Sequence, residues 1–384
     1  MAPPPHRVFV TALRLADFRN HATLSLTADR RSVVLLGENG AGKTNVLEAL
    51  SLLSPGRGLR RAQRAEIARQ GGTGGYAVSA DVDGAVGPVR IAVAADPDEP
   101  SRRLTVDGER QKSLDVLSDH LRVLWLTPAM DGLFTGPAGD RRRFLDRMVL
   151  AIDPAHGRRV VAFEQALTQR NRLLEDLRPD PVWLDGVETQ IAGLGVAVAA
   201  ARREMVGCLA RLIGDDADAE PGKGAPFPTA AVALDGEIEA ALERTSASDV
   251  EDWYRTDLGA GRSRDRAAGR TLSGPHRTDL VVLHAAKAMP AALSSTGEQK
   301  ALLIGLILAQ ARLVAEMAGM TPVLLLDEVA AHLDPARRAG LFARLDRLGC
   351  QAFLTGADRA AFAALGSAAA VVELVGLSEG GGMR

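Results

Sequence analysis

The chain of 384 residues is predicted to form an α/β head from its two ends, with a helical arm inserted between them. A Gly-rich turn lies between a strand-like and a helix-like run near residue 40. An apolar run that ends in two carboxylates lies near residue 327. Between these two features, apolar residues recur at helical spacing. We therefore expect residues 1–138 and 271–384 to form the halves of the head, and residues 139–270 to form the arm.

Short strand-like runs separated by turns dominate the first third of the chain. A Gly-rich turn separates the third strand from a helix that begins at Lys43 and ends near Leu53. Polar turns such as Asp83-Gly84 and Asp107-Gly108 predict an antiparallel meander between residues 76 and 106. The expected strands are residues 8–15, 23–26, 32–36, 76–82, 89–94, 103–106 and 121–126.

Helical patterns fill the middle of the chain, and strands return in the last third. Phe163, Leu167, Leu174 and Leu177 are expected on one helix face. Further helices are expected at residues 182–213, 297–317 and 334–348, with two short ones between 235 and 258. Residues 214–228 are rich in Gly and Pro and predict an exposed loop. The expected strands are residues 279–284, 322–326 and 351–355.

Composition limits the classes of protein that fit. With 46% hydrophobic residues, 24% charged residues and a net charge of -2, the chain should be soluble and has no global positive field. The two cysteines, Cys208 and Cys350, predict neither a disulfide framework nor a zinc site, which fits the reducing cytoplasm. The start of the chain does not resemble a signal peptide, and apolar stretches at 191–201 and 301–309 are too short to span a bilayer.

The Gly-rich turn reads Gly37-Glu38-Asn39-Gly40-Ala41-Gly42-Lys43-Thr44 and fits the P-loop pattern G-x-x-x-x-G-K-[ST]. Glycines let successive backbone N–H groups point at phosphate oxygens, and the following helix N-terminus favours negative charge. Lys43 should neutralise the β- and γ-phosphates of ATP, and the Thr44 hydroxyl should ligate Mg²⁺. The alternative is a Gly-rich turn with an accidental lysine, and the second motif argues against it.

That second motif is the run from Val323 to Leu326, followed by Asp327 and Glu328. Four apolar residues predict a buried parallel strand, and open α/β sheets place ligands at the carboxyl ends of such strands. Asp327 would hold the water shell of the Mg²⁺ ion, and Glu328 would be the general base for the attacking water.

Two further stretches resemble motifs of ABC-type ATPases. Residues 294–300, Ser-Ser-Thr-Gly-Glu-Gln-Lys, resemble the signature motif, and residues 330–334, which end at Asp334, resemble the D-loop. The resemblance implies that Ser295, Thr296 and Gly297 close over the γ-phosphate bound to a second head. Either Ser295 or Thr296 is the contact residue. The same residues also read as an N-cap that opens a helix.

Within that superfamily the chain resembles the RecF family over almost its whole length, except for residues 154–270. The matching stretches are residues 13–20, the P-loop with its extension through Asn45 to Leu50, residues 56–60, 141–146 and 273–280. The resemblance adds Arg19, Asn20 and Asn45 to the nucleotide-binding residues. Residues 126–130 depart from the family pattern, so no Q-loop role is assigned there, although Asp131 is a candidate substitute. Asp327-Glu328 is nearer to the general ABC form than the Asp-Asp that is common in the family.

Basic clusters suggest where DNA could bind. They are Arg57, Arg60, Arg61 and Arg64; Arg141, Arg142 and Arg143; and Arg262, Arg264, Arg266 and Arg270. Each cluster is equally compatible with a solvated or ion-paired face. The functional interpretation, made for the first two, is contact with DNA phosphates without base readout. His276 is expected to be a packed residue.

The resemblance implies a cytoplasmic, ATP-driven homodimer that binds gapped or duplex DNA and helps RecO and RecR load RecA in DNA repair, replication and recombination, including the SOS response to damage. An alternative is the nucleotide-binding subunit of an ABC transporter, which would not need the Phe18-Arg19-Asn20 turn or a long insertion. An SMC-like structural ATPase is a second alternative, but it would need hundreds of heptad residues between the motifs.

Overall fold

The computed structural model describes residues 4–99, 102–219, 227–330 and 333–374. The chain divides into two compact units, which we call the head unit and the arm unit. The head unit comprises Met1–Asp131, Gly222–Pro228 and Ser295–Arg384, and the arm unit comprises Gly132–Pro221 and Thr229–Ser294. A head built from both ends of the chain was predicted from the sequence.

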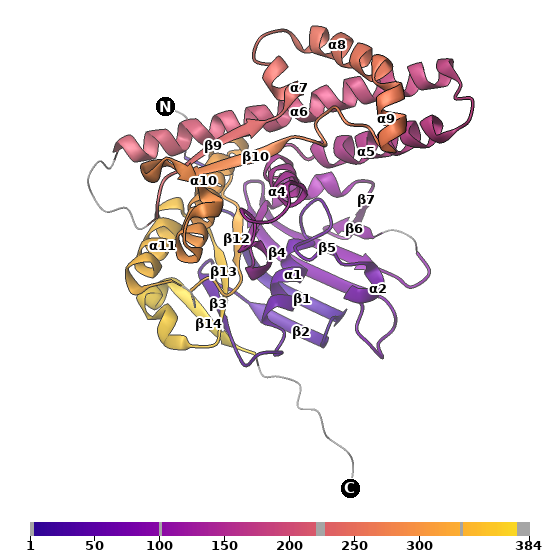
Figure 1. The fold of residues 1–384 in the computed structure, drawn as a ribbon. Helices are drawn as coiled ribbons and strands as arrows, with labels where there is room; N and C mark the ends of the chain where they lie inside the picture. Colours follow the sequence, from indigo (N-terminus) through magenta and orange to yellow (C-terminus); the bar gives the residue numbers. More distant parts are fainter. Residues whose placement is uncertain (1–3, 100–101, 220–226, 331–332, 375–384) are drawn as a thin grey trace. The chain divides into compact units, whose positions relative to one another are not determined.

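A five-stranded parallel sheet forms the centre of the head unit (Figure 1). Its order is β14 (Ala369–Glu373), β3 (Ser32–Leu36), β13 (Ala352–Gly356), β12 (Val323–Leu326) and β8 (Val123–Leu126). The three inner strands are almost continuously apolar and buried, as expected for parallel strands covered on both faces. Strands from the two chain ends are direct neighbours, which confirms the predicted α/β head.

A six-stranded antiparallel sheet forms the second layer of the head unit. Its order is β2 (His21–Thr27), β1 (Phe9–Phe18), β4 (Tyr76–Gly84), β5 (Gly87–Ala95), β6 (Arg103–Val106) and β7 (Glu109–Gln111). The predicted meander is therefore correct. Strand β1 is longer than expected because it pairs with both β2 and β4.

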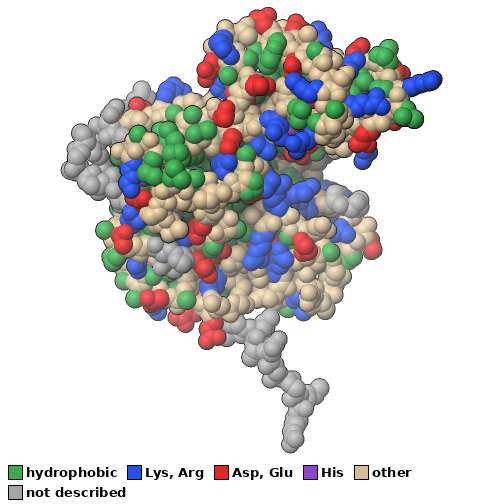
Figure 2. Space-filling model, in the orientation of Figure 1, with side chains coloured by type: hydrophobic (Ala, Val, Ile, Leu, Met, Phe, Trp, Pro, Cys, Tyr) green, Lys and Arg blue, Asp and Glu red, His purple; other side chains and the backbone are tan. Residues whose placement is uncertain are grey.

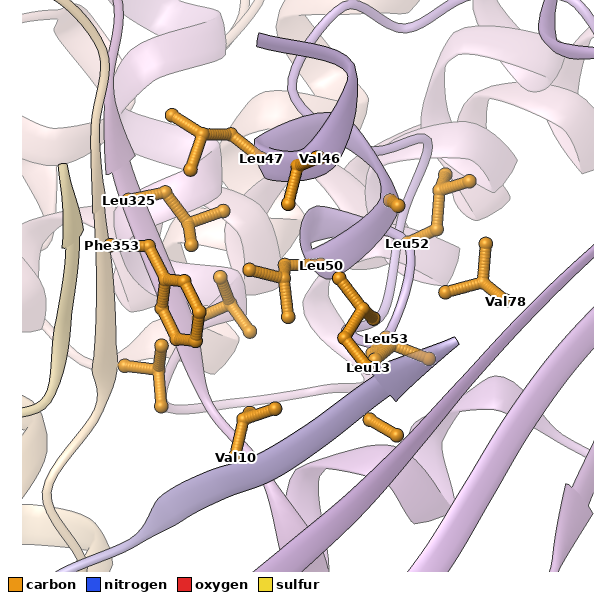
Figure 3. Packing of buried hydrophobic residues seen from close by; sticks show 14 of the residues in the cluster. Val10, Leu13, Val46, Leu47, Leu50, Leu52, Leu53, Val78, Leu325 and Phe353 are labelled. Atoms are coloured by element: carbon orange, nitrogen blue, oxygen red, sulfur yellow. The ribbon is translucent and has the colours of Figure 1, made fainter. Parts of the chain in front are cut away.

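Helix α1 (Lys43–Ser51) packs between the two sheets (Figure 3). On one side it meets Val10 and Leu13 of β1, and on the other it meets Leu325 and Phe353 of the parallel sheet. All four residues are fully buried. This packing fixes the start of α1 at the carboxyl edge of the parallel strands.

The other helices of the head unit cover the sheets. They are α2 (Arg64–Ile67), α3 (Leu117–His120), α10 (Thr296–Ala318) and α11 (Pro335–Leu348), with short 3-10 turns at Leu114–Val116, Pro128–Met130 and Arg359–Ala368. Among the described residues, α10 is the one helix long and apolar enough to cross a membrane, but 72% of its most apolar window is buried inside the protein. Core helices of soluble proteins pass the same test, so this is weak support for a membrane span.

The arm unit is mainly helical. Its helices are α4 (Ala138–Leu150), α5 (His156–Glu175), α6 (Pro181–Ala219), α7 (Glu237–Ala241), α8 (Ala247–Ala260) and α9 (Arg262–Ala268). Figure 1 shows α5 running alongside α6. Phe163 and Leu167 of α5, Ile191 of α6 and Tyr254 of α8 share one apolar cluster. A small sheet of β11 (Met289–Pro290), β10 (Asp279–His284) and β9 (Ala230–Asp235) completes the unit, with 3-10 turns at Ala285–Lys287 and Ala291–Leu293.

The structure corrects several expectations from the sequence. Strand β10 was assigned to the head, but residues 271–294 belong to the arm unit because β10 pairs along its whole length with β9. Leu177 lies beyond the end of α5 and is 93% exposed, so it is not on the helix face with Phe163. Helix α6 continues to Ala219, where an exposed loop was expected. Strands β9 and β14 were not predicted, because both are alanine-rich and short.

A buried arginine organises the polar interior of the arm unit. Arg170 is 0% exposed and donates to Glu188, at 2.9 Å, and to Asp265, at 2.8 Å. It also donates to the Thr271 hydroxyl and to the Leu258 carbonyl oxygen. A single side chain therefore connects α5, α6, α8, α9 and the segment that follows α9.

Replacing Arg170 with Ala should lower the free energy of unfolding by about 3–5 kcal/mol, because the buried Asp265 carboxylate would lose its close cationic partner, whereas Glu188 would keep its ion pair with Arg262. Arg255→Ala is the matched control, since its ion pair with Asp252 is exposed and should contribute less than about 1 kcal/mol. Urea unfolding measures both variants. A loss for Arg170→Ala that is no larger than the loss for Arg255→Ala would contradict the assigned role.

Candidate nucleotide-binding site

The loop between β3 and α1 has the backbone that a phosphate cradle requires. Gly37, Gly40 and Gly42 have φ angles of 154°, 89° and 92°, which disfavour any residue with a side chain. At Gly42 a Cβ atom would also lie 2.5 Å from His21 Nε2 and 2.8 Å from Asn20 Nδ2. Only glycine fits there, so the P-loop glycines have a structural cause in this chain.

The side chain of Lys43 is held over the loop by backbone carbonyl oxygens of the loop. Its Nζ atom donates to the carbonyl oxygens of Gly37, at 2.7 Å, and Glu38, at 2.8 Å, and the residue is only 6% exposed. The ammonium group can still turn from these neutral acceptors toward a phosphate, because charge-assisted hydrogen bonds are stronger.

The two ends of the chain meet at Asp327, immediately after β12. The Thr44 hydroxyl at the start of α1 donates to both oxygens of the Asp327 carboxylate at 3.1 Å. Thr355, at the end of β13, donates to Asp327 Oδ1 at 2.7 Å. Since β13 lies between β3 and β12, Thr355 bridges the gap between the two motif-bearing strands. The structure therefore unites the P-loop and the Asp-Glu motif as the sequence predicted.

Glu328 occupies an unusual backbone conformation beside this contact. Its φ angle is 52°, in a region that a residue with a side chain adopts at a cost of about 1–2 kcal/mol. The Glu328 N–H donates to the Thr355 hydroxyl at 2.8 Å, which holds the backbone there. Strained backbone of this kind clusters at functional sites. Thr355 was not named from the sequence, although its position at the carboxyl end of a predicted parallel strand was the available signal.

A buried carboxylate, Glu48, organises the side chains beneath the P-loop. Glu48 is 1% exposed and accepts hydrogen bonds from Arg19, at 2.5 and 2.7 Å, and from Arg60, at 3.0 Å. Arg19 also donates to the carbonyl oxygen of Glu66. The predicted nucleotide contact Arg19 therefore has its guanidinium engaged by protein groups, and Glu48 itself was not identified from the sequence.

Asn20 and Asn45 lie together beside the loop. Asn45 Nδ2 donates to Asn20 Oδ1 at 2.7 Å, and Asn20 Nδ2 lies 3.4 Å from the carbonyl oxygen of Gly40. His21 packs on Gly42, and burial lowers its pKa although a hydrogen bond to the Gly42 carbonyl oxygen opposes the shift. A neutral imidazole at pH 7 adds no charge to the cradle.

The signature residues begin α10. The Ser295 hydroxyl accepts from the Glu298 N–H and the Glu298 carboxylate accepts from the Ser295 N–H, so the predicted N-cap is present. Ser295, Thr296 and Gly297 are exposed, and the N–H groups of Thr296 and Gly297 lie in the first turn of the helix, where no intrahelical acceptor exists for them. Of the predicted D-loop, Ala331 and His332 lie outside the described residues. Asp334 caps α11 by accepting from the Arg337 N–H at 2.8 Å.

Asp131, the candidate substitute for the Q-loop, contacts the signature helix. Its carboxylate accepts from Lys300 Nζ at 3.2 Å, and Lys300 is only 7% exposed. The ion pair ties the end of the first head segment to α10. It gives Asp131 a partner of opposite charge about one turn into the signature helix.

The basic clusters differ in how their side chains are used. Arg57 and Arg61 are exposed, and Figure 2 shows Lys and Arg side chains gathered over the part of the head unit that holds α1 and β4. In the arm unit, Arg141 forms a bidentate pair with Asp279 at 2.7 Å, and Arg142 donates to the Thr278 carbonyl oxygen. Arg143 is exposed and pairs with Asp140. His276 Nε2 donates to the Thr271 carbonyl oxygen, and the ring is packed against Phe163, as expected.

A divalent cation of the hard type fits the donor set at Asp327. The site offers one carboxylate and the Thr44 hydroxyl within 3.1 Å of each other, and Mg²⁺ prefers a few oxygen ligands of this kind together with phosphate oxygens. Among the described residues no group of three or more His, Cys, Asp and Glu side chains could hold a metal by itself. A metal at this site would therefore depend on phosphate oxygens from a nucleotide.

Sequence comparison places the chain in a known family. Residues 9–375 match the RecF/RecN/SMC N-terminal domain family. The chain is 57% identical over 367 residues to the DNA replication and repair protein RecF of Rhizobium rhizogenes, a match that covers 95% of this chain and 96% of that protein. It is 55% identical over 367 residues to the protein of the same name from Rhizobium meliloti, with the same coverage.

Solved structures agree at the level of the fold. A structure described as the recombination mediator protein RecF-ATPrS in the RecFOR pathway superimposes with a TM-score of 0.82 at 21% identity, and it covers 93% of this chain and 95% of the other. A RecF-ATP structure from the same pathway gives 0.79 at 21% identity and covers 92% of each chain. An Smc head bound to the winged-helix domain of ScpA gives 0.52 at 14% identity, and it covers 93% of this chain and 91% of the other. The chain therefore belongs to the RecF family of SMC/ABC-type ATPases.

Proposed function

We propose that the protein is an ATP-driven, DNA-binding switch of recombinational repair and replication. The observation that carries the proposal is the contact between Thr44 and Asp327, because it joins the P-loop from one chain end to the Asp-Glu motif from the other. The names of the relatives, DNA replication and repair protein RecF, support the biological role.

ATP would be bound by residues 37–45. The backbone N–H groups of the loop would face the phosphate oxygens, and Lys43 would turn from the Gly37 and Glu38 carbonyl oxygens to the β- and γ-phosphates. Thr44 and Asp327 would hold Mg²⁺, which when bound spreads the negative charge of the phosphates. Arg19 would act through Glu48 as a positioning residue, and Asn20 and Asn45 would line the side of the loop.

Hydrolysis would use Glu328 as the general base. Glu328 accepts the proton of a water whose oxygen attacks the γ-phosphorus, and the bond to the β–γ bridging oxygen breaks, so ADP leaves with the electron pair. Thr355 positions the base, because it holds the Glu328 N–H and the Asp327 carboxylate with one hydroxyl. Hydrolysis would be slow and would accompany DNA binding.

Two subunits would form composite sites. Ser295, Thr296 and Gly297 are exposed at the start of a helix of 23 residues, where N–H groups and the helix dipole favour a phosphate. In the ATP-bound homodimer, these residues would cover the γ-phosphate held by the partner subunit's P-loop. Asp334 would lie at the same contact.

DNA binding would use charge and not base edges. Arg57, Arg60, Arg61 and Arg64 form the leading cluster, with Arg143 and the less available Arg141 and Arg142 as a second. Such contacts neutralise phosphates without sequence readout. The cytoplasmic role would be to bind gapped or duplex DNA and to work with RecO and RecR in loading RecA. The transporter and SMC-like alternatives have less support, because relatives of 55–57% identity carry the RecF name.

Glu328→Gln should leave ATP affinity unchanged but slow hydrolysis by about 10²–10⁴, the usual effect of losing a general base. The ATP-bound dimer should then accumulate. Glu373→Gln is the control, since this carboxylate is 71% exposed at the end of β14. Phosphate release measures the rate of hydrolysis. If Glu328→Gln hydrolyses ATP at the wild-type rate, another group is the base.

Ser295→Arg should preserve ATP binding by the monomer and block dimerisation. The bulky cationic side chain would occupy the position of the γ-phosphate that the partner subunit binds. Ser367→Arg, at an exposed position of the same unit, should dimerise normally. Light scattering with and without ATP measures the oligomeric state. Loss of ATP binding by the isolated Ser295→Arg monomer would place the signature in cis and refute the composite site.

DNA affinity should rise with ATP and should not depend on sequence. Dimerisation brings two copies of each basic cluster onto one assembly, and the logarithm of affinity falls with a salt slope of about -0.9 per phosphate contact. The measurement is a salt titration on two unrelated duplexes, with and without ATP, using Lys43→Ala as the nucleotide-free reference. Equal affinity in both nucleotide states would refute the switch, and preference for one duplex would refute backbone binding.

A further inference from the structure

Among the buried donors without acceptors in the described part of the head unit, three lie on β4, at the start of α2 and just before β6. They are the Tyr76 hydroxyl, Nη1 of Arg64 and Nη1 of Arg102, and none of these buried atoms has a hydrogen-bond partner among the described residues. A buried donor without an acceptor is unfavourable, and a charged one more so. Such groups in native structures have an explanation in strain, in an ordered water or ion, or in a ligand or function.

Other contacts bring these side chains to one place. The second Nη atom of Arg64 donates to the carbonyl oxygen of Pro97 at 2.7 Å. Tyr76 pairs with Ala95, two residues before Pro97, across β4 and β5. The second Nη atom of Arg102 donates to the carbonyl oxygen of Gly56, next to Arg57. Each arginine is thus anchored by one nitrogen and leaves the other without an acceptor.

The local charge is positive. Burial lowers the pKa of the Arg102 guanidinium, and the charge of Arg57 lowers it further. Burial raises the pKa of the Tyr76 phenol, while the charges of Arg102 and Arg64 oppose the shift, so the hydroxyl remains a donor at neutral pH. The carboxylate whose charge acts on the Tyr76 phenol is Glu48, which already accepts from Arg19 and Arg60.

We propose that Tyr76, Arg64 and Arg102 form a pocket for a single phosphate group, with the exposed Arg57 recruiting it. Two guanidinium groups and a phenol supply donors that match phosphate oxygens. The pocket is distinct from the P-loop, because its donors come from β4, from the first residue of α2 and from the residue before β6. The phosphate comes from the backbone of DNA or from a nucleotide, and the first of these sources rests on the proposed function.

Entry of the phosphate requires the long arginine side chains to turn toward it. Their flexible ends allow this, since each is anchored to a neutral carbonyl oxygen that a charged acceptor can replace. Tyr76 is fixed more firmly, because it is 4% exposed and its ring packs edge-on against the ring of Phe18, with 5.7 Å between the ring centroids.

The first measurement is a titration with inorganic phosphate, followed by phosphorus NMR. It uses the Lys43→Ala background, so that the P-loop does not contribute. Adding Arg102→Gln should weaken phosphate binding about tenfold, and adding Tyr76→Phe about threefold. Arg103→Gln is the control, because this neighbouring arginine pairs with Asp96 at 2.7 Å and should have no effect. Thermal unfolding checks that each variant is folded.

The second measurement identifies the source of the phosphate, in the otherwise native chain. Loss of duplex affinity with Arg102→Gln, with a salt slope smaller by about one and ATP affinity intact, assigns the pocket to the DNA backbone. Loss of ATP affinity instead assigns it to a nucleotide. If Arg102→Gln and Tyr76→Phe bind phosphate, DNA and ATP like the Arg103→Gln control, the pocket does not exist. If the wild-type protein fails to bind DNA, the proposed function fails, while the phosphate titration still decides the pocket.

Discussion

The burial of α1 between the two sheets is the constraint on which the head depends. Leu47 and Leu50 are fully buried, and each such side chain contributes about 1.5–3 kcal/mol on leaving water. The P-loop leads directly into this helix, so the packing sets where the loop points. The sheets on either side contain strands from both chain ends, and the cradle can form only when the ends have come together.

The polar contacts at the edge of the parallel sheet complete what the packing begins. Asp327 is 4% exposed and accepts from Thr44 and Thr355, so its buried charge is satisfied by hydroxyl donors that a metal could replace. Thr355 also fixes the left-handed backbone of Glu328. One threonine on the intervening strand thereby sets the geometry of both acidic residues.

The arm unit is stabilised by its own interior. Its apolar cluster is separate from the core around α1, and Arg170 supplies a buried polar centre that joins several of its helices. Its strand β10 follows directly on the Gly-Pro-His-Arg segment, so a stretch with a strong family resemblance serves the arm and not the head. Resemblance along a sequence does not reveal which unit a segment joins, because that depends on its pairing partner.

Local sequence patterns were enough to predict the P-loop turn, the Asp-Glu strand, the antiparallel meander and the capped start of α10. Each of these is a local pattern: glycines where the backbone needs positive φ, alternation along strands, and Ser295 with Glu298 at a helix start. Tertiary structure alone decided the rest. Thr355 bridges the two motif-bearing strands, and Glu48 accepts hydrogen bonds from Arg19 and Arg60. The charges of Arg64 and Arg102 act on Tyr76. In each case the residues become neighbours only after folding. Leu177 and β10 show the same limit. A hydrophobic residue has a preference for burial and a strand pattern has a preference for pairing, but only the folded chain supplies the partner.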